Sequence, residues 1–284
     1  MSRSGKNGLF LLFCATCMFS IGGVCFACIP FHPLAANGLR CAIAAGLSAC
    51  FLRRDQQKLR LNAATLTGGL CLALTTNLFA LAVPLAGPAA ATLLLNTSPL
   101  FVAGILWVKH KKCPPMRQLA AAVLAVGGVA IAAGGMPGRM AGLAVGLASG
   151  ACYAGVFCAG QGQNAHPPSA FFLGQCVGAA AGLPFLVFVR PEQVTPAALG
   201  AAAVLGLVQL GYSYRLLARG MALSGPMAAS VVCSLEPVLG TVWPWLLGGG
   251  APGLRMAAGA ALLALAAVTA NSTDGSAPAP QPSR

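Results

Sequence analysis

The chain has 284 residues, of which 57 % are hydrophobic and only 7 % are charged. Soluble domains carry about 25 % charged residues, so the composition excludes an ordinary soluble enzyme or binding domain and predicts an integral membrane protein. The formal net charge is +13, but the basic residues lie in short loops between apolar runs, as is typical of membrane proteins. We therefore expect a lipid bilayer as the surrounding partner and no nucleic acid.

Ten apolar runs follow one another along the chain, each long enough to cross most of a bilayer core of about 30 Å at about 1.5 Å per residue. They cover residues 8–28, 34–52, 62–83, 88–108, 117–133, 140–160, 169–189, 197–218, 225–247 and 254–270. The last stretch, residues 271–284, is rich in Ser, Pro and Ala, and we expect it to form a disordered cytoplasmic tail.

The sequence repeats itself at a distance of 138 positions. Residues 87–117 align with residues 225–255 without a gap, and the matched residues are mainly turn and kink residues rather than common apolar ones: Gly87 with Gly225, Pro88 with Pro226, Pro99 with Pro237, Trp107 with Trp245, and Pro114 with Pro252. We predict two copies of one unit, at residues 8–134 and 139–270. Each copy holds five spans, an odd number, so the second enters the membrane from the opposite face. The predicted fold is all-α, with ten transmembrane helices as two inverted five-helix repeats.

The distribution of Lys and Arg predicts the orientation. Loops and ends on one side of the membrane carry 13 of these residues, and those on the other side carry 3. Because basic residues accumulate on the cytoplasmic side, we expect both termini in the cytoplasm of a multi-pass plasma (inner) membrane protein.

One stretch resembles a known signature. It runs from Ala228-Ala229-Ser230 through Leu235-Glu236-Pro237-Val238 to Trp245-Leu246-Leu247-Gly248. This segment resembles the ninth helix of the drug/metabolite transporter superfamily, in its ten-helix branch built from two EamA-type domains. Arg40 in Asn37-Gly38-Leu39-Arg40 resembles the arginine that family members tend to carry in helix two. The chain departs from the family at residues 248–250, where Gly-Gly-Gly replaces a frequent Gly-Glu. The resemblance implies transport of small metabolites.

Two charged residues lie well inside spans, and both are candidate substrate-binding residues. Glu236 is the only acid inside a span, and Arg40 is the only basic residue well inside one. Each costs about 2.5–3.5 kcal/mol when unpaired at mid-membrane depth. Glu236 is either a proton, cation or amine site or a structural buried carboxyl, and Arg40 either binds a carboxylate or phosphate or has a structural role. The sequence leaves open whether the two side chains pair with each other.

Further candidate substrate-binding residues are polar or aromatic and lie at middle depth. Gln175 is the helix-two counterpart of Arg40, and Ser98 is the repeat equivalent of Glu236. Most polar residues inside membranes hold helices together, which is the alternative interpretation for each of them. The remaining candidates are Asn96, Gln209, Phe19, Tyr153 and Trp243, and the predicted hinges are Pro99 and Pro237. Gly142, Gly146 and Gly150 form a row of small residues, and we expect this row to pack within the bundle.

No set of residues indicates catalysis, and we expect neither an enzyme nor a cofactor. The pairs Cys14/Cys17 and Cys25/Cys28 are 11 residues apart, or about 16 Å along one helix, which is too far for one zinc site. We predict a secondary transporter, in the export direction, for small metabolites such as amino acids, working by alternating access, with proton coupling as an open option. The alternative is a membrane scaffold that does not transport. A homodimer is also considered.

Overall fold

The computed structural model describes residues 3–86, 88–111, 113–133, 140–161, 164–240, 242–246 and 253–271. Throughout these residues the regular structure is helical, and they contain no β-strand. Six of the helices are long and apolar enough to cross a membrane, while the remaining passes are shorter or interrupted. The chain is therefore an all-α integral membrane protein. The predicted tail beyond Asn271 lies outside the described residues.

The first repeat supplies five passes. Pass one consists of α1 (Arg3–Ser20) and α2 (Gly22–Ala27), pass two is α3 (Pro33–Arg54), pass three is α4 (Ala63–Ala86), pass four consists of α5 (Pro88–Leu95) and α6 (Ser98–His110), and pass five is α7 (Met116–Ala133). Two of these five passes are thus interrupted in their course.

The second repeat follows the same order with more irregular helices. Its elements are α8 (Met140–Ala159), α9 (Pro167–Gly182) with the 3-10 helices η1 (Leu183–Phe188) and η2 (Pro191–Gln193), α10 (Pro196–Val204), the π-helix η3 (Leu205–Tyr212), α11 (Ser213–Cys233), α12 (Glu236–Gly240), α13 (Val242–Leu246) and α14 (Leu254–Asn271). Passes eight and nine are joined within α11 at Gly225, whose φ of 79° and ψ of 167° suit glycine alone.

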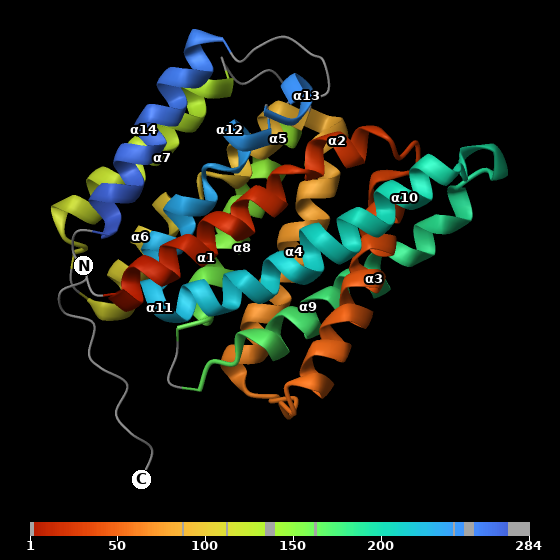
Figure 1. The fold of residues 1–284 in the computed structure, drawn as a ribbon, viewed down its shortest axis with the longest axis horizontal. Helices are drawn as coiled ribbons and strands as arrows, with labels where there is room; N and C mark the ends of the chain where they lie inside the picture. The colour runs from red at the N-terminus through yellow and green to blue at the C-terminus, as the bar shows by residue number, and fades with distance from the viewer. Residues whose placement is uncertain are drawn as a thin grey trace.

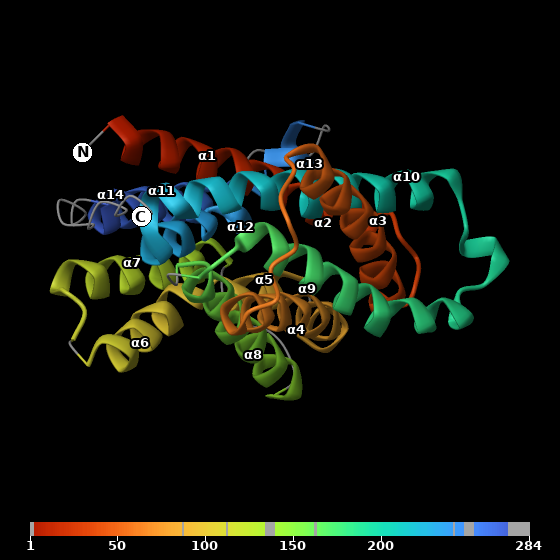
Figure 2. The same cartoon turned by 90° about the horizontal axis from the view of Figure 1, so that it is seen from below.

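Helix pairing follows the repeat. On one side of the molecule α1 packs on α11, and on the other α4 packs on α8 (Figure 2). The first pair joins passes one and eight, and the second joins passes six and three. Pass six is the repeat equivalent of pass one, and pass three is the equivalent of pass eight, so the two pairs are equivalent contacts. Two further pairs, α3–α9 and α7–α14, each join a helix to its own equivalent in the other repeat. They lie at two ends of the molecule in Figure 1. This is the pattern that a two-fold relation between the repeats produces.

The second helix of each repeat begins in the same way. His32 Nδ1 accepts a hydrogen bond from the Leu34 backbone N–H at 3.3 Å, and His166 Nδ1 accepts one from the Ser169 N–H at 3.3 Å. A proline follows each histidine at the first helical position, where its missing N–H is not needed. The side chains thus satisfy backbone donors that the first turn leaves free.

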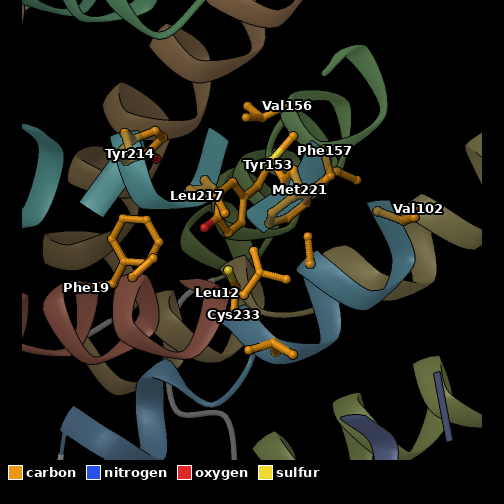
Figure 3. Packing of buried hydrophobic residues seen from close by; sticks show 14 of the residues in the cluster. Leu12, Phe19, Val102, Tyr153, Val156, Phe157, Tyr214, Leu217, Met221 and Cys233 are labelled. Atoms are coloured by element: carbon orange, nitrogen blue, oxygen red, sulfur yellow. The ribbon is translucent and has the colours of Figure 1, made fainter. Parts of the chain in front are cut away.

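Buried apolar residues form two clusters. The larger one occupies the centre of the bundle and includes Leu12, Phe157 and Leu217 (Figure 3). The smaller one, called the Pro30-end cluster, lies where the loop after pass one meets α3, α10 and η3. It consists of Ile29, Phe31, Ala35, Ala36, Ala198, Ala202 and Leu205. At the same end Gln193 Nε2 donates to the Pro30 carbonyl at 2.6 Å.

The opposite end of passes two, seven and eight is held by polar contacts, called the Asp55-end contacts. They are the ion pair of Arg215 with Asp55 at 2.8 Å, the hydrogen bond from the Arg60 N–H to Ser169 Oγ at 3.1 Å, and that from Asn62 Nδ2 to the Asn164 carbonyl at 2.7 Å. Segments predicted to share a membrane side are therefore in contact at each end.

Candidate functional site

The fourth and ninth passes are broken at equivalent positions. In pass four α5 ends at Leu95 and α6 begins at Ser98, and in pass nine α11 ends at Cys233 and α12 begins at Glu236. The two helix ends before the breaks are 138 positions apart (233 − 95), and so are the two helix starts after them (236 − 98). This is the spacing of the sequence repeat. The break is therefore a property of the repeated unit.

Prolines explain where the helices break. Pro99 and Pro237 each lie one residue into the second half-helix, and a proline has no N–H for the carbonyl four residues earlier. The carbonyls that lose this donor are those of Leu95 and Cys233, the last residues before each break. The two prolines thus lie beside the interruptions that the sequence predicts, and their role as hinges remains a prediction.

The two breaks touch each other in the middle of the chain's fold. Ser234 Oγ donates to its own helix at the Ser230 carbonyl, 3.0 Å away, and lies 3.4 Å from the carbonyl oxygen of Asn96. We call residues 94–98 and 233–236 the junction. Asn96 and Ser98 are buried within it, and their Oδ1 and Oγ atoms have no hydrogen-bond partner in the part of the chain that the structure describes.

Helix α8 packs closely on the first break. A methyl group added at Gly150 would lie 2.5 Å from the Leu94 carbonyl oxygen and 2.9 Å from Thr97 Oγ1, so only glycine allows this approach. Gly142 and Gly146 meet the end of α4 and the Leu94 side chain in the same way. The predicted packing of this small-residue row inside the bundle is confirmed.

Glu236 opens α12 at the second break and is half-buried. Its carboxyl group is close enough to Arg40, Tyr153 and Tyr214 to interact with them electrostatically. Among the described residues no side chain forms a hydrogen bond or an ion pair with this carboxylate. The described residues thus offer this carboxylate no direct partner inside the membrane region.

Arg40 is buried and bound elsewhere. Its Nε donates to Asn37 Oδ1 at 2.9 Å and its Nη1 to Gln209 Oε1 at 2.7 Å, while its Cζ atom lies 4.7 Å from the centre of the Phe26 ring. None of its nitrogens lies within 4.0 Å of a Glu236 oxygen, since the ion pair found among the described residues is that of Arg215 with Asp55. In this structure the two membrane charges are separate.

Two glutamines that the sequence singled out hold helices together. Gln209, in the π-helix, donates through Nε2 to the Phe19 carbonyl at 3.0 Å, next to the interruption between α1 and α2. Gln175 donates to the Leu210 carbonyl at 3.0 Å and accepts from Ser48 Oγ at 2.6 Å. Because both ends of the Gln175 amide have protein partners, this side chain joins α9, η3 and α3.

Aromatic rings pack against one another in the core of the bundle (Figure 3). The Phe19 and Tyr214 rings meet edge to face at 5.2 Å, Tyr214 meets Phe171 at 4.9 Å, and Tyr153 packs on Phe157 at 4.5 Å. The sequence analysis did not single out Tyr214. The available signal was its position inside an apolar run in a chain with only three tyrosines.

Trp243 has a different place from the other candidates. It lies on α13 and donates through Nε1 to Ser20 Oγ at 2.8 Å. The structure thus groups the predicted residues in three sets. Glu236, Ser98, Asn96 and Tyr153 lie around the junction, Arg40, Gln209 and Phe19 form a neighbouring network, and Gln175 and Trp243 tie helices together.

Within the described residues no group of three or more His, Cys, Asp or Glu side chains is arranged to hold a metal ion. The oxygen atoms at the junction that have no hydrogen-bond partner among the described residues, Asn96 Oδ1 and Ser98 Oγ, are candidate ligands for a small cation. For an organic ligand, the charged groups that the site offers are Glu236 and Arg40.

Two repeats of membrane passes, with two broken helices that meet inside the bundle and a carboxylate at their junction, form the architecture that inverted-repeat membrane transporters share. The model of the EamA-like transporter family matches residues 6–134 and 140–272. The chain belongs to the EamA-like transporter family, whose members are transporters rather than enzymes.

A solved structure titled "Crystal structure of protein" is similar in fold, with a TM-score of 0.77 and 19 % identity over 95 % of this chain and 98 % of that chain. At this identity the likeness shows the fold alone. No curated protein matches the chain.

Proposed function

We propose that the protein is a secondary transporter that exports small zwitterionic metabolites, such as amino acids, by alternating access. The observation that carries this proposal is the half-buried Glu236 carboxylate at the junction of two broken helices, without a direct partner among the described residues. A charge at this depth costs about 2.5–3.5 kcal/mol, so the arrangement favours a ligand that brings a positive charge.

Arg40 supplies the second half of the recognition. Its Nε and Nη1 are bound, whereas Nη2 has no acceptor among the described residues. A guanidinium group binds carboxylates through parallel N–H donors. The ring of Tyr214 packs against Phe19 and Phe171, and Tyr214 is near enough to interact electrostatically with both Arg40 and Glu236. An amine at Glu236 and a carboxylate at Arg40 would together select a zwitterion.

The two ends of the bundle support the export direction. The Pro30-end cluster is apolar and buried, whereas the Asp55-end contacts are a partly exposed ion pair and two hydrogen bonds, of which the one from Asn62 is exposed to water. Exposed ion pairs contribute only about 0–1 kcal/mol. The Asp55 end, which the Lys and Arg distribution assigns to the cytoplasm, therefore opens with less loss of interaction, and substrate enters from that side.

The proposed location is a plasma (inner) membrane, and the same Lys and Arg distribution supports cytoplasmic termini. A proton is one candidate for the coupling ion, because Glu236 can release or take up a proton as the substrate amine enters or leaves. A non-transporting scaffold has no use for a carboxylate left unpaired in the membrane. A homodimer remains compatible with this function, since each chain carries a complete junction.

The test begins with metabolite profiling of cells with and without the protein, followed by efflux of the identified compound from proteoliposomes. We expect Glu236→Gln to lower the efflux rate at least about tenfold, the loss expected for one charged contact of about 1.4 kcal/mol. Glu192→Gln is the matched control, since Glu192 is exposed in η2. An unchanged rate in Glu236→Gln would remove the carboxylate from the mechanism.

A second variant separates binding from structure. Because Arg40 and Glu236 are not paired, the double variant Arg40→Gln with Glu236→Gln should not regain activity. Recovery of transport in the double variant would instead mean that the two residues form a structural pair.

A further inference from the structure

The junction contains buried hydrogen-bonding atoms that have no partner among the described residues. Pro99 and Pro237 deprive the Leu95 and Cys233 carbonyls of their helical donors. Asn96 Oδ1 also has no partner in the described part of the chain, although Asn96 is 1 % exposed and its Nδ2 donates to the Thr92 carbonyl at 2.9 Å. A buried polar atom without a partner costs about 1–3 kcal/mol.

A second buried oxygen stands without a partner at the start of α6. Ser98 is fully buried, and no hydrogen bond is made to or from its Oγ by the described residues. Its repeat equivalent is Glu236, which begins α12 in the same register. The two breaks touch where Ser234 Oγ lies 3.4 Å from the Asn96 carbonyl oxygen, so these oxygens belong to one region.

Glu236 adds a negative charge that forms no ion pair among the described residues. Tyr153, one turn beyond Gly150 on α8, interacts electrostatically with Glu236, and Gly150 itself packs against the Leu95 carbonyl region. Glu236 also lies two residues after Ser234, whose Oγ is 3.4 Å from the Asn96 carbonyl oxygen, so the carboxylate belongs to the same region as the first break. Arg40, the basic residue inside the membrane region, is bound to Asn37 and Gln209 instead.

This combination has the chemistry of a cation site. Carbonyl, amide, hydroxyl and carboxylate oxygens are hard ligands that suit alkali and alkaline-earth ions. Only one carboxylate is present, which balances a single positive charge. Freed carbonyls at interrupted membrane helices are known ligands of sodium in transporters. The donor set therefore favours a monovalent ion over a divalent one.

We propose that the junction binds one sodium-class monovalent cation through the Leu95 carbonyl, Asn96 Oδ1 and Ser98 Oγ, with Glu236 supplying the balancing charge. The role of the bound ion as the coupling ion rests on the proposed transport function, whereas the binding itself does not. Because sodium and a proton would both be held by Glu236, they compete for the site.

The test is equilibrium binding of radioactive sodium to the purified full chain in detergent. We expect saturable binding of about one ion per chain, and a loss of affinity of about tenfold or more in Ser98→Ala, as for other residues that shape a metal site. The matched control is Ser224→Ala, because Ser224 Oγ is also buried without a partner but lies beside Gly8, away from the junction. The unfolding temperature without sodium shows that both variants are folded.

The outcomes separate the ion site from the transport function. Absence of saturable binding to the folded chain would mean that water alone occupies the junction, and equal losses in Ser98→Ala and Ser224→Ala would mean a non-specific effect; either overturns the proposal. Transport at an unchanged rate without sodium would remove the coupling role while leaving transport intact. Sodium binding without transport of any metabolite would support the site and remove the function.

Discussion

The two ends of the bundle are built from repeat-related helices and yet are held together by different forces. At one end the Pro30-end cluster packs apolar side chains from α3, α10 and η3. At the other the Asp55-end contacts join passes two, seven and eight through an ion pair and hydrogen bonds between partly exposed groups. A backbone that repeats itself therefore does not make the energies of the two ends equal. The following predictions, from the largest expected effect to the smallest, test this difference.

Leu205→Ala should have the largest effect, because it removes a fully buried side chain of the Pro30-end cluster. Large-to-small changes in packed cores cost about 2–5 kcal/mol, and packing is the main source of helix association in a membrane. The apparent free energy of unfolding in detergent measures the loss. Leu207→Ala is the control, since Leu207 is 40 % exposed on the same helix. Equal losses in both variants would contradict the special role of the cluster.

Gln209→Leu should destabilise the polar network between the Pro30-end cluster and the junction. The change leaves Arg40 Nη1 and the Phe19 carbonyl without their partners, and each unpaired buried group costs about 1–3 kcal/mol. We expect a loss of about 2 kcal/mol or more in the same unfolding experiment. Gln193→Leu is a control at an exposed amide of the same end. A loss no larger than in this control would show that water replaces Gln209 freely.

Asp55→Asn should have a much smaller effect, because the ion pair with Arg215 is partly exposed. A double-mutant cycle with Arg215→Gln should give a coupling energy of about 0.2–1 kcal/mol, decreasing as salt is added. The Arg215 guanidinium also lies 4.2 Å from the Phe51 ring centre, so part of its contribution will survive in Asp55→Asn. A coupling above about 2 kcal/mol would mean that this end is held as firmly as the Pro30 end.

The smallest effect concerns His166, which lies in the loop before α9. Burial, and secondly the nearby Arg60 charge, lower the pKa of His166 below its ordinary value of 6.5. The unfolded chain then binds more protons, so the stabilisation is full above pH 6.5 and is lost as the pH falls toward the lower folded-state pKa. Protonation also removes the Nδ1 acceptor of the Ser169 N–H.

We expect the unfolding temperature to fall slightly through this histidine between pH 7.5 and pH 5, because a partly exposed group contributes little to stability. His166→Asn keeps a capping acceptor but cannot be protonated in this range, so its curve should lack this component. Identical pH dependence of the unfolding temperature in His166→Asn and in the unmodified protein would show that His166 does not contribute to this dependence.

Much of the architecture was predictable, because proline and glycine mark backbone geometry directly. The 138-residue repeat located both helix breaks, since Pro99 and Pro237 determine which carbonyls lose their donors. The Gly142–Gly146–Gly150 row predicted close packing for the same reason. The His-Pro starts of α3 and α9 were also readable in the sequence, yet the capping role of the histidines appeared only in the structure.

The contacts of the candidate site were less predictable. The positions of Arg40 and Glu236 within their spans predicted similar depths in the membrane. They could not predict that Arg40 would form hydrogen bonds with Asn37 and Gln209. Side-chain partners depend on helix rotation, and the π-helix changes the rotation of everything after it, including Tyr214. No local pattern in residues 205–212 announces such a turn, because bonds from residue i to i+5 depend on neighbouring helices.

The π-helix also records something about ancestry. The His-Pro helix starts are 134 positions apart (166 − 32), whereas the helix breaks are 138 apart (233 − 95), so the second half has gained four residues between these points relative to the first. A π-helical stretch takes in surplus residues while its two ends continue as helix, here into α10 and α11. If the halves descend from one duplicated gene, this segment is where later insertions were tolerated, and an alignment of the halves must place a gap there.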